Sequence, residues 1–177
     1  DSVSTTKSAN TLAAWRLRLH GPAQLLAPDG TTWALDRLTA LIAARLALAG
    51  PQPRERMARQ LWPDALEARA RGNLRQRLLR LKAQVGWAWI DGGAQLRLHP
   101  HVGLDPTAKG LLLEGLPAPG DEELANWLQA LRRAEQHEQA QDLQRQLSHF
   151  EASQQWDEAI AAAEQLVALD PGAEASR

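Results

Sequence analysis

The sequence predicts two domains of different class, an α+β domain followed by an all-α domain. Short alternating runs such as residues 14–19 have the period of strands, and they precede longer runs with the period of helices. After Gly120 only helical patterns remain. The charge divides at the same place. Residues 1–120 hold 16 basic and 9 acidic residues, a net charge of +7, whereas residues 121–177 hold 4 and 12, a net charge of −8. Such a split indicates two modules with different partners.

The first domain is expected to span residues 13–105. Asp36 is placed to cap a helix that Gly50 ends, and Gly86 is placed to end a long one. The expected elements are strands at 14–19, 24–27 and 31–35, helices at 37–50, 53–62 and 65–85, a hairpin of strands 87–90 and 94–99 around Asp91-Gly92-Gly93, and an edge strand at 102–105. Residues 106–120, rich in proline and glycine, are predicted to be a connector with an apolar anchor at 111–113.

Composition excludes several classes of protein. The 177 residues include no cysteine, which excludes disulfides, cysteine-ligated zinc and thiol catalysis. A chain without cysteine suits a reducing compartment, and we expect the cytoplasm. No apolar run approaches the roughly 20 residues that a membrane-spanning helix needs, so no membrane partner is expected. The polar residues 1–12 are expected to be a disordered leader.

The long helix at 65–85 has two distinct faces. At about 100° per residue, Leu74, Leu78, Leu81 and Val85 form one narrow stripe, which is the expected core face. The opposite face collects amide and guanidinium side chains, which pair well with adenine and guanine edges in the major groove of DNA. We therefore expect base contacts from Arg69, Asn73, Gln76 and Arg80.

The cations around this face are suited to phosphates. Residues 54–82 carry nine basic residues and three acids, and the long helix has no acid after Glu67, so its charge is not balanced by pairs along the helix. A shorter helix and a tight Pro63-Asp64 turn precede it, as a helix-turn-helix requires. A solvated basic face is the ordinary alternative. The phosphate contacts that we expect come from Arg71, Arg75, Arg77, Lys82, Arg54 and Arg97.

Residues 121–177 are expected to form three amphipathic helices at 121–135, 137–153 and 156–169. Within the last, WDEAIAAAEQLVALDP fits the second half of a tetratricopeptide (TPR) unit. Its packing and turn positions are Trp156, Ala159, Ile160, Leu166 and Pro171. Because one repeat rarely buries its apolar face alone, further repeats are expected in the parent protein, and this domain is expected to be truncated. Helices that merely fill their own core remain the alternative to a peptide-binding groove.

Three segments together resemble the OmpR-type winged helix of bacterial regulators of the antibiotic regulatory protein (SARP) class. They are LTALIAARLALAG (38–50), PRERMARQLWPD (53–64) and RARGNLRQRLLRLKAQVG (69–86). Residues 111–135 and the WDEAI…LDP segment resemble the bacterial transcriptional activator domain that follows the winged helix in this class. The resemblance implies a winged helix-turn-helix followed by a TPR-like helical domain.

The resemblance also implies a function and partners. Asn73, Arg75 and Gln76 match the Asn-Leu-Arg-Gln stretch of the family's recognition helix, and residues 91–97 match its wing. It implies a transcriptional activator that binds promoter DNA sequence-specifically, as a homodimer or in tandem on direct repeats. The helical domain would serve oligomerisation or contact with RNA polymerase.

Other chemistry finds little support in the sequence. No GxxxxGK[ST], GxSxG or HExxH motif occurs, so no enzyme and no cofactor are expected. His99 and His101 flank Pro100, and a solvated pair is expected rather than a metal site. Trp87 and Trp89 are expected to pack on the long helix, and Trp156 to lie in a core. The alternative to a DNA-binding regulator is a protein-interaction module, in which the winged helix is a docking surface.

Overall fold

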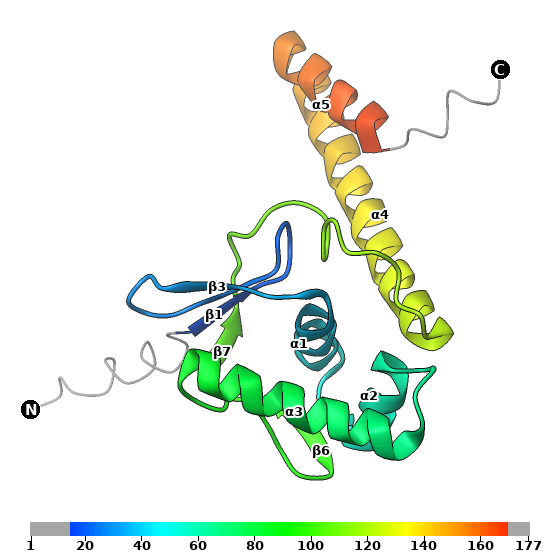
Figure 1. Cartoon of the computed structure of the whole chain (residues 1–177). Coiled ribbons are helices and arrows are strands. Elements are labelled where there is room, and N and C mark those ends of the chain that lie inside the picture. Colours follow the sequence, from blue (N-terminus) through cyan, green and yellow to red (C-terminus); the bar gives the residue numbers. More distant parts are fainter. Residues whose placement is uncertain (1–14, 170–177) are drawn as a thin grey trace, which may run out of the picture. The chain divides into compact units, whose positions relative to one another are not determined.

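A computed structural model describes residues 15–169, which form five helices and seven short strands of mixed α+β structure (Figure 1). The chain divides into two compact units, Asp1–Ala125 and Asn126–Arg177, and the division falls inside one long helix. The expected leader at 1–12 lies outside the described residues, as does Pro171. Within the described range, no helix combines the length and the apolar character needed to cross a membrane.

The first unit begins with a four-stranded sheet in the order β3-β2-β1-β7. Its strands are β1 (Trp15–Arg18), β2 (Gln24–Leu26), β3 (Thr32–Ala34) and β7 (Val102–Leu104). The first three form an antiparallel meander, and β7 lies parallel to β1 with Val102 opposite Trp15. The three expected N-terminal strands and the expected edge strand are therefore confirmed, with ends that differ by a residue or two.

Three helices follow the meander: α1 (Arg37–Ala49), α2 (Arg54–Leu61) and α3 (Glu67–Val85). The Asp36 carboxylate accepts a hydrogen bond from the Thr39 N–H at 2.9 Å and so caps α1, as expected. Residues 39–46 of α1 are all buried, so this helix forms the centre of the core. The last of the three helices, α3, ends at Gly86, whose φ of 96° lies in the left-handed region that favours glycine.

The second sheet has three strands in the order β4-β6-β5. They are β4 (Gln52–Pro53), β5 (Ile90–Asp91) and β6 (Gln95–Leu98), all antiparallel. The hairpin is confirmed, although its first strand starts at Ile90 rather than at 87. Gly92 has a φ of 121°, and a Cβ there would lie 1.9 Å from the Gln95 carbonyl oxygen. The turn therefore requires glycine. Sequence periodicity did not predict β4, which has only two residues.

The segment 106–120 is packed against the first sheet. Leu112 and Leu113 are fully buried, and the Leu113 N–H donates to the Leu19 carbonyl at 2.7 Å. The Arg37 guanidinium donates to the Ala118 carbonyl at 2.9 Å. The expected apolar anchor at 111–113 thus holds this stretch to the first unit, and only Leu111 of the three remains exposed.

The second unit differs from the expected three helices. One continuous helix, α4 (Glu122–Ala152), replaces the helices expected at 121–135 and 137–153, and α5 (Trp156–Leu169) follows. The apolar pattern weakens between Arg132 and Asp142, but neither glycine nor proline occurs there. A polar stretch without a breaker does not end a helix, because the backbone hydrogen bonds continue through it.

Trp156 is placed differently from the sequence-based expectation, whereas several tryptophans of the first unit pack with other rings or in the core. Trp89 is fully buried, whereas Trp87 packs against Trp15 at 5.2 Å between ring centroids and against His99 at 5.1 Å. Trp15 in turn stacks on Trp33 at 5.6 Å. Trp156, expected in a core, is 60% exposed. A pair of helices buries only one face of α5, which is the face of Ala159 and Ala162.

Asp36 joins the start of α1 to α3, because it also forms an ion pair with Arg77. Burial raises the pKa of the Asp36 carboxyl, but the hydrogen bonds from Thr39 and from the Arg77 guanidinium outweigh that effect. The pKa of Asp36 consequently lies below its ordinary value. A carboxyl with a lowered folded pKa stabilises the fold above its unfolded pKa, and this contribution is lost as the pH falls through the folded pKa.

The Asp36→Asn variant isolates this charge, since asparagine is also a good N-cap. At pH 7 we expect it to lower the free energy of unfolding by roughly 0.2–1 kcal/mol, the range of exposed ion pairs. The difference from the wild type should narrow as the pH falls below about 4. Urea unfolding across this pH range measures it. A difference that stayed constant with pH would contradict the ion pair with Arg77.

Candidate nucleic-acid interface

The orientation of α3 is set by its apolar positions. Ala70, Leu74 and Leu81 are buried, and Leu78 and Val85 are half-buried. The core face expected from the sequence is therefore confirmed, with Ala70 added to it. Since these residues fix one side of the helix, the residues about 180° away necessarily face away from the core.

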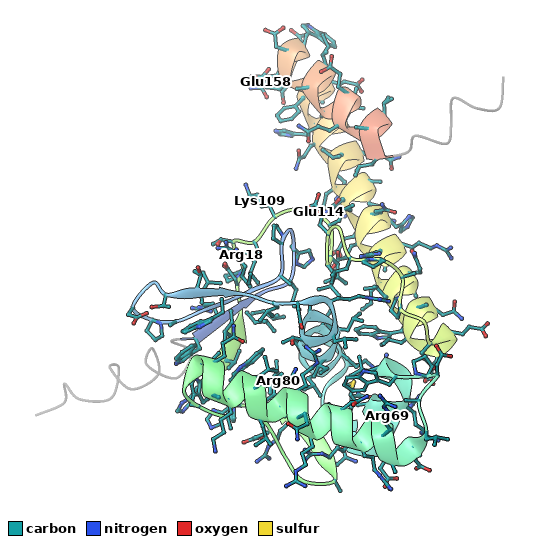
Figure 2. All side chains as sticks on the ribbon, viewed as in Figure 1. Arg18, Arg69, Arg80, Lys109, Glu114 and Glu158 are labelled. Carbon is teal, nitrogen blue, oxygen red and sulfur yellow. The ribbon has the colours of Figure 1, made fainter. Side chains whose placement is uncertain are left out.

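The outward side of α3 carries most of the residues expected to contact bases. Arg69, near the start of the helix, and Arg80, in its second half, are exposed (Figure 2). Gln76 is exposed between them, whereas Asn73 is half-buried at the margin of the face. Gly72 lies on the same side, and apart from the adjacent backbone of α3 a Cβ built at Gly72 has no heavy atom within 4 Å. The helix thus offers a narrow, open surface at this level.

Arg77, expected to contact phosphate, lies in a different environment. Its guanidinium pairs with Asp36 and donates to the Thr39 hydroxyl at 3.2 Å, and its side chain is only 22% exposed. Arg77 therefore links α3 to the start of α1. Arg75 and Lys82 are both exposed, and among the described residues no ion pair involves either side chain.

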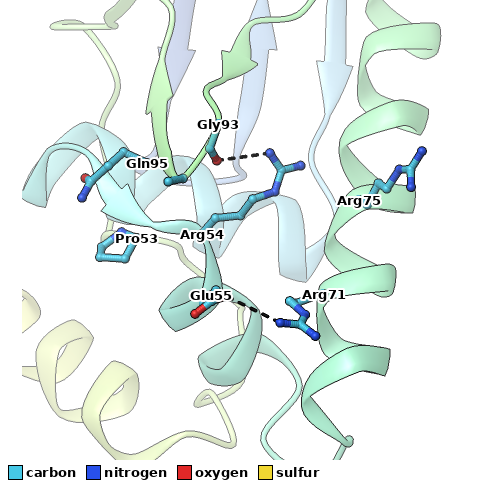
Figure 3. A pocket seen from close by; sticks show the side chains of 8 residues that line it. Pro53, Arg54, Glu55, Arg71, Arg75, Gly93 and Gln95 are labelled. Carbon is cyan, nitrogen blue, oxygen red and sulfur yellow. Dashed lines mark hydrogen bonds and ion pairs between the residues drawn. The ribbon is translucent and has the colours of Figure 1, made fainter.

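A groove of about 650 Å³ lies between α3 and the turn of the β5–β6 hairpin. Arg71 and Arg75 line it from α3, and Arg54 lines it from the start of α2 (Figure 3). Arg54 donates to the Gly92 carbonyl at 2.9 Å, which fixes the guanidinium beside the turn. With three guanidinium groups against one carboxylate, that of Glu55, the groove has a net positive charge and suits an anionic strand.

The acids near this face hold its cations only weakly. Arg71 lies 3.5 Å from the Glu55 carboxylate, and both side chains are more than half exposed. Arg97, on β6, lies 3.1 Å from Asp91 and is also mostly exposed. Exposed pairs of this kind contribute little stability, so a phosphate can replace the carboxylate at small cost.

Sequence reasoning missed three features of this surface. Leu79 is 53% exposed on the outward side of α3, and its position on the helical wheel was sufficient to predict this. The contact of Glu55 with Arg71 depends on how α2 packs on α3, which periodicity does not reveal. The groove beside Pro53 depends on β4, whose pairing with β6 joins residues far apart in the sequence.

Sites for other chemistry are few. In the part of the chain that the structure describes, no three histidine, aspartate or glutamate side chains gather as metal ligands would. His99 and His101 lie ring to ring at 4.7 Å, and the His101 N–H donates to His99 Nδ1. His99 also packs edge-on against Trp87. The pair therefore belongs to the aromatic packing of the first unit.

Taken together, α3 and the hairpin turn form a cationic surface with an open centre. Guanidinium groups at the edges can bind phosphates, and Gln76 and Arg80 can donate hydrogen bonds to base edges. Comparisons with protein families, with curated proteins and with solved structures find no match to this chain.

The Gly72→Ala variant tests whether packing within the protein requires this glycine. Because a Cβ would meet no atom there, we expect alanine to raise the free energy of unfolding by roughly 0.5–1 kcal/mol through its better helix propensity. Gly92→Ala is the matched control and should lower it, since a Cβ there collides with the Gln95 carbonyl. Denaturant unfolding measures both. A loss of stability in Gly72→Ala would mean that α3 is packed on its outward side.

Proposed function

We propose that this protein is a sequence-specific DNA-binding regulator of transcription, in which α3 enters the major groove. In this proposal α1, α2 and α3 are the helices of a winged helix-turn-helix, and the β5–β6 hairpin is its wing. The shared segment order with SARP-class activators supports the activator role and a location in the cytoplasm.

One observation carries the proposal: the outward side of α3 is cationic, open and not balanced by acids. After Glu67 the helix has six basic residues and no acid. Five of these six are exposed; Arg71 pairs with Glu55 at the surface, and Arg77 pairs with Asp36 and is half-buried. Such charge costs self-repulsion in the free protein, and a polyanion relieves it. The open position at Gly72 permits close approach of a duplex.

The residues divide by the part of DNA that they contact. In this proposal Arg69, Gln76 and Arg80 contact base edges, with Asn73 at the margin. Phosphate contacts come from Arg71, Arg75, Lys82, Arg54 and Arg97. Arg77 is left out, because its guanidinium is engaged by Asp36 and Thr39.

The second unit has a separate part in the proposal. From Asn126 to Leu169 it holds three basic and seven acidic residues, so its net charge of −4 disfavours contact with DNA. We propose that α4 and α5 form a TPR-like unit for oligomerisation on direct repeats or for contact with RNA polymerase. The exposed Trp156, Ile160 and Val167 on α5 also favour the second candidate function, a protein-interaction module.

Selection of bound duplexes from a random-sequence pool tests the proposed function. We expect a defined motif to be enriched, and binding to the selected duplex to weaken steeply as salt rises. An interaction module without DNA binding would enrich no motif and would retain no duplex at any salt concentration. That result would reject the proposal.

The Arg75→Ala variant separates phosphate contact from general charge. We expect weaker binding to every duplex and a slope of log K against log salt that is smaller by about 1. Arg145→Ala removes the same charge from an exposed arginine of α4 and is the matched control. It should leave both affinity and slope unchanged. Equal effects of the two variants would show that only the net charge matters and that α3 is not the binding surface.

A further inference from the structure

Leu79 is an apolar side chain at the centre of a charged surface. Gly72, Gln76, Leu79 and Ala83 are spaced by four, three and four residues, so they form one line along α3. All four are exposed, and Leu79 is 53% exposed. This line lies opposite the buried Leu74, so it is the part of the helix farthest from the core.

The neighbours of Leu79 on the helix surface include no other large apolar side chain. The positions three and four residues away are Arg75, Gln76, Lys82 and Ala83, and each of them is exposed. A single exposed leucine is common on a protein surface. Leu79 differs from such a residue because it lies in a line of uncharged residues along α3, with cations beside that line.

We propose that Leu79 recognises thymine through the C5-methyl group, at one base pair of the bound sequence. This inference rests on the proposed function. Arg71, Arg75 and Lys82 lie together on one flank of this line, and Arg69 and Arg80, proposed to contact bases, lie on the other. If the first flank binds phosphates along one strand, the line itself faces the base edges. Only thymine presents a methyl group there, and an apolar side chain is its usual partner.

Gln76 and Leu79, on neighbouring turns of α3, would recognise bases in different ways. Gln76 donates and accepts hydrogen bonds, whereas Leu79 has neither capacity and can distinguish bases only by contact. A cytosine at the same place presents a hydrogen where thymine has the methyl, together with an amino group. Leu79 would leave the amino group of cytosine and the O4 of thymine equally without a hydrogen bond. It therefore favours thymine by the contact with the methyl group alone.

The test removes the methyl group without changing base pairing. In the duplex selected from the random pool, each thymine is replaced singly by deoxyuridine, and the affinity of the whole chain is measured for each duplex. With the wild type, replacement at one position in each bound site should weaken binding about fourfold, from the loss of one buried methyl contact. With Leu79→Ala, that position should lose its sensitivity while the other positions behave as before.

Ile160→Ala, on α5, is the matched control, since it also shortens an exposed apolar side chain. It should keep the wild-type pattern. Leu79→Ala should unfold like the wild type, because its side chain is not part of the core. A wild type that tolerates deoxyuridine at every position overturns the inference, and so does a sensitive position that stays sensitive in Leu79→Ala. Both results occur with DNA binding intact, whereas a wild type that binds no duplex rejects the proposed function as well.

Discussion

Burial of one side of α3 is the constraint on which the rest of the arrangement depends. Ala70, Leu74 and Leu81 must leave water, because each buried leucine contributes on the order of 2 kcal/mol of transfer free energy. Once they are buried, the helix has no freedom to rotate about its axis. The line from Gly72 to Ala83 then faces outward. The apolar residues that stabilise the domain therefore also determine which polar residues of α3 are exposed to a partner.

Ion pairs within the domain further determine which cations remain exposed. Arg77 is drawn inward to Asp36, and Arg56, on α2, pairs with Glu123. These pairs take up cations that lie away from the outward face. Arg75 and Lys82 stay exposed, and the acid near Arg71 is itself more than half exposed. The charge that remains is concentrated on α3 and beside the hairpin turn. A polyanion that follows this surface gains contacts without first breaking a buried ion pair.

Features of the fold that depend on neighbouring residues in the sequence could be predicted, whereas contacts between residues far apart in the sequence could not. Asp36, Gly86 and the period of Leu74 and Leu81 set the helix ends and the core face before any tertiary contact is known. The continuous α4 differs from the two helices predicted there, because a loss of apolar period without glycine or proline does not end a helix. The partner of Arg77 could not be predicted, since Asp36 comes from a segment 41 residues earlier. Similarly, β4 owes its two residues to pairing with β6, which no local propensity encodes.

The central claim, that the outward line of α3 lies in the major groove, can be measured directly because the chain has no cysteine. The Ala83→Cys variant would be mixed with duplexes of the selected sequence that carry a tethered thiol. The tether is attached either to cytosine N4, in the major groove, or to guanine N2, in the minor groove. Ala161→Cys, also exposed but on α5, is the control. The account predicts a disulfide cross-link between position 83 and the major-groove tether alone. Cross-linking only to the minor-groove tether, or equally from position 161, would contradict it.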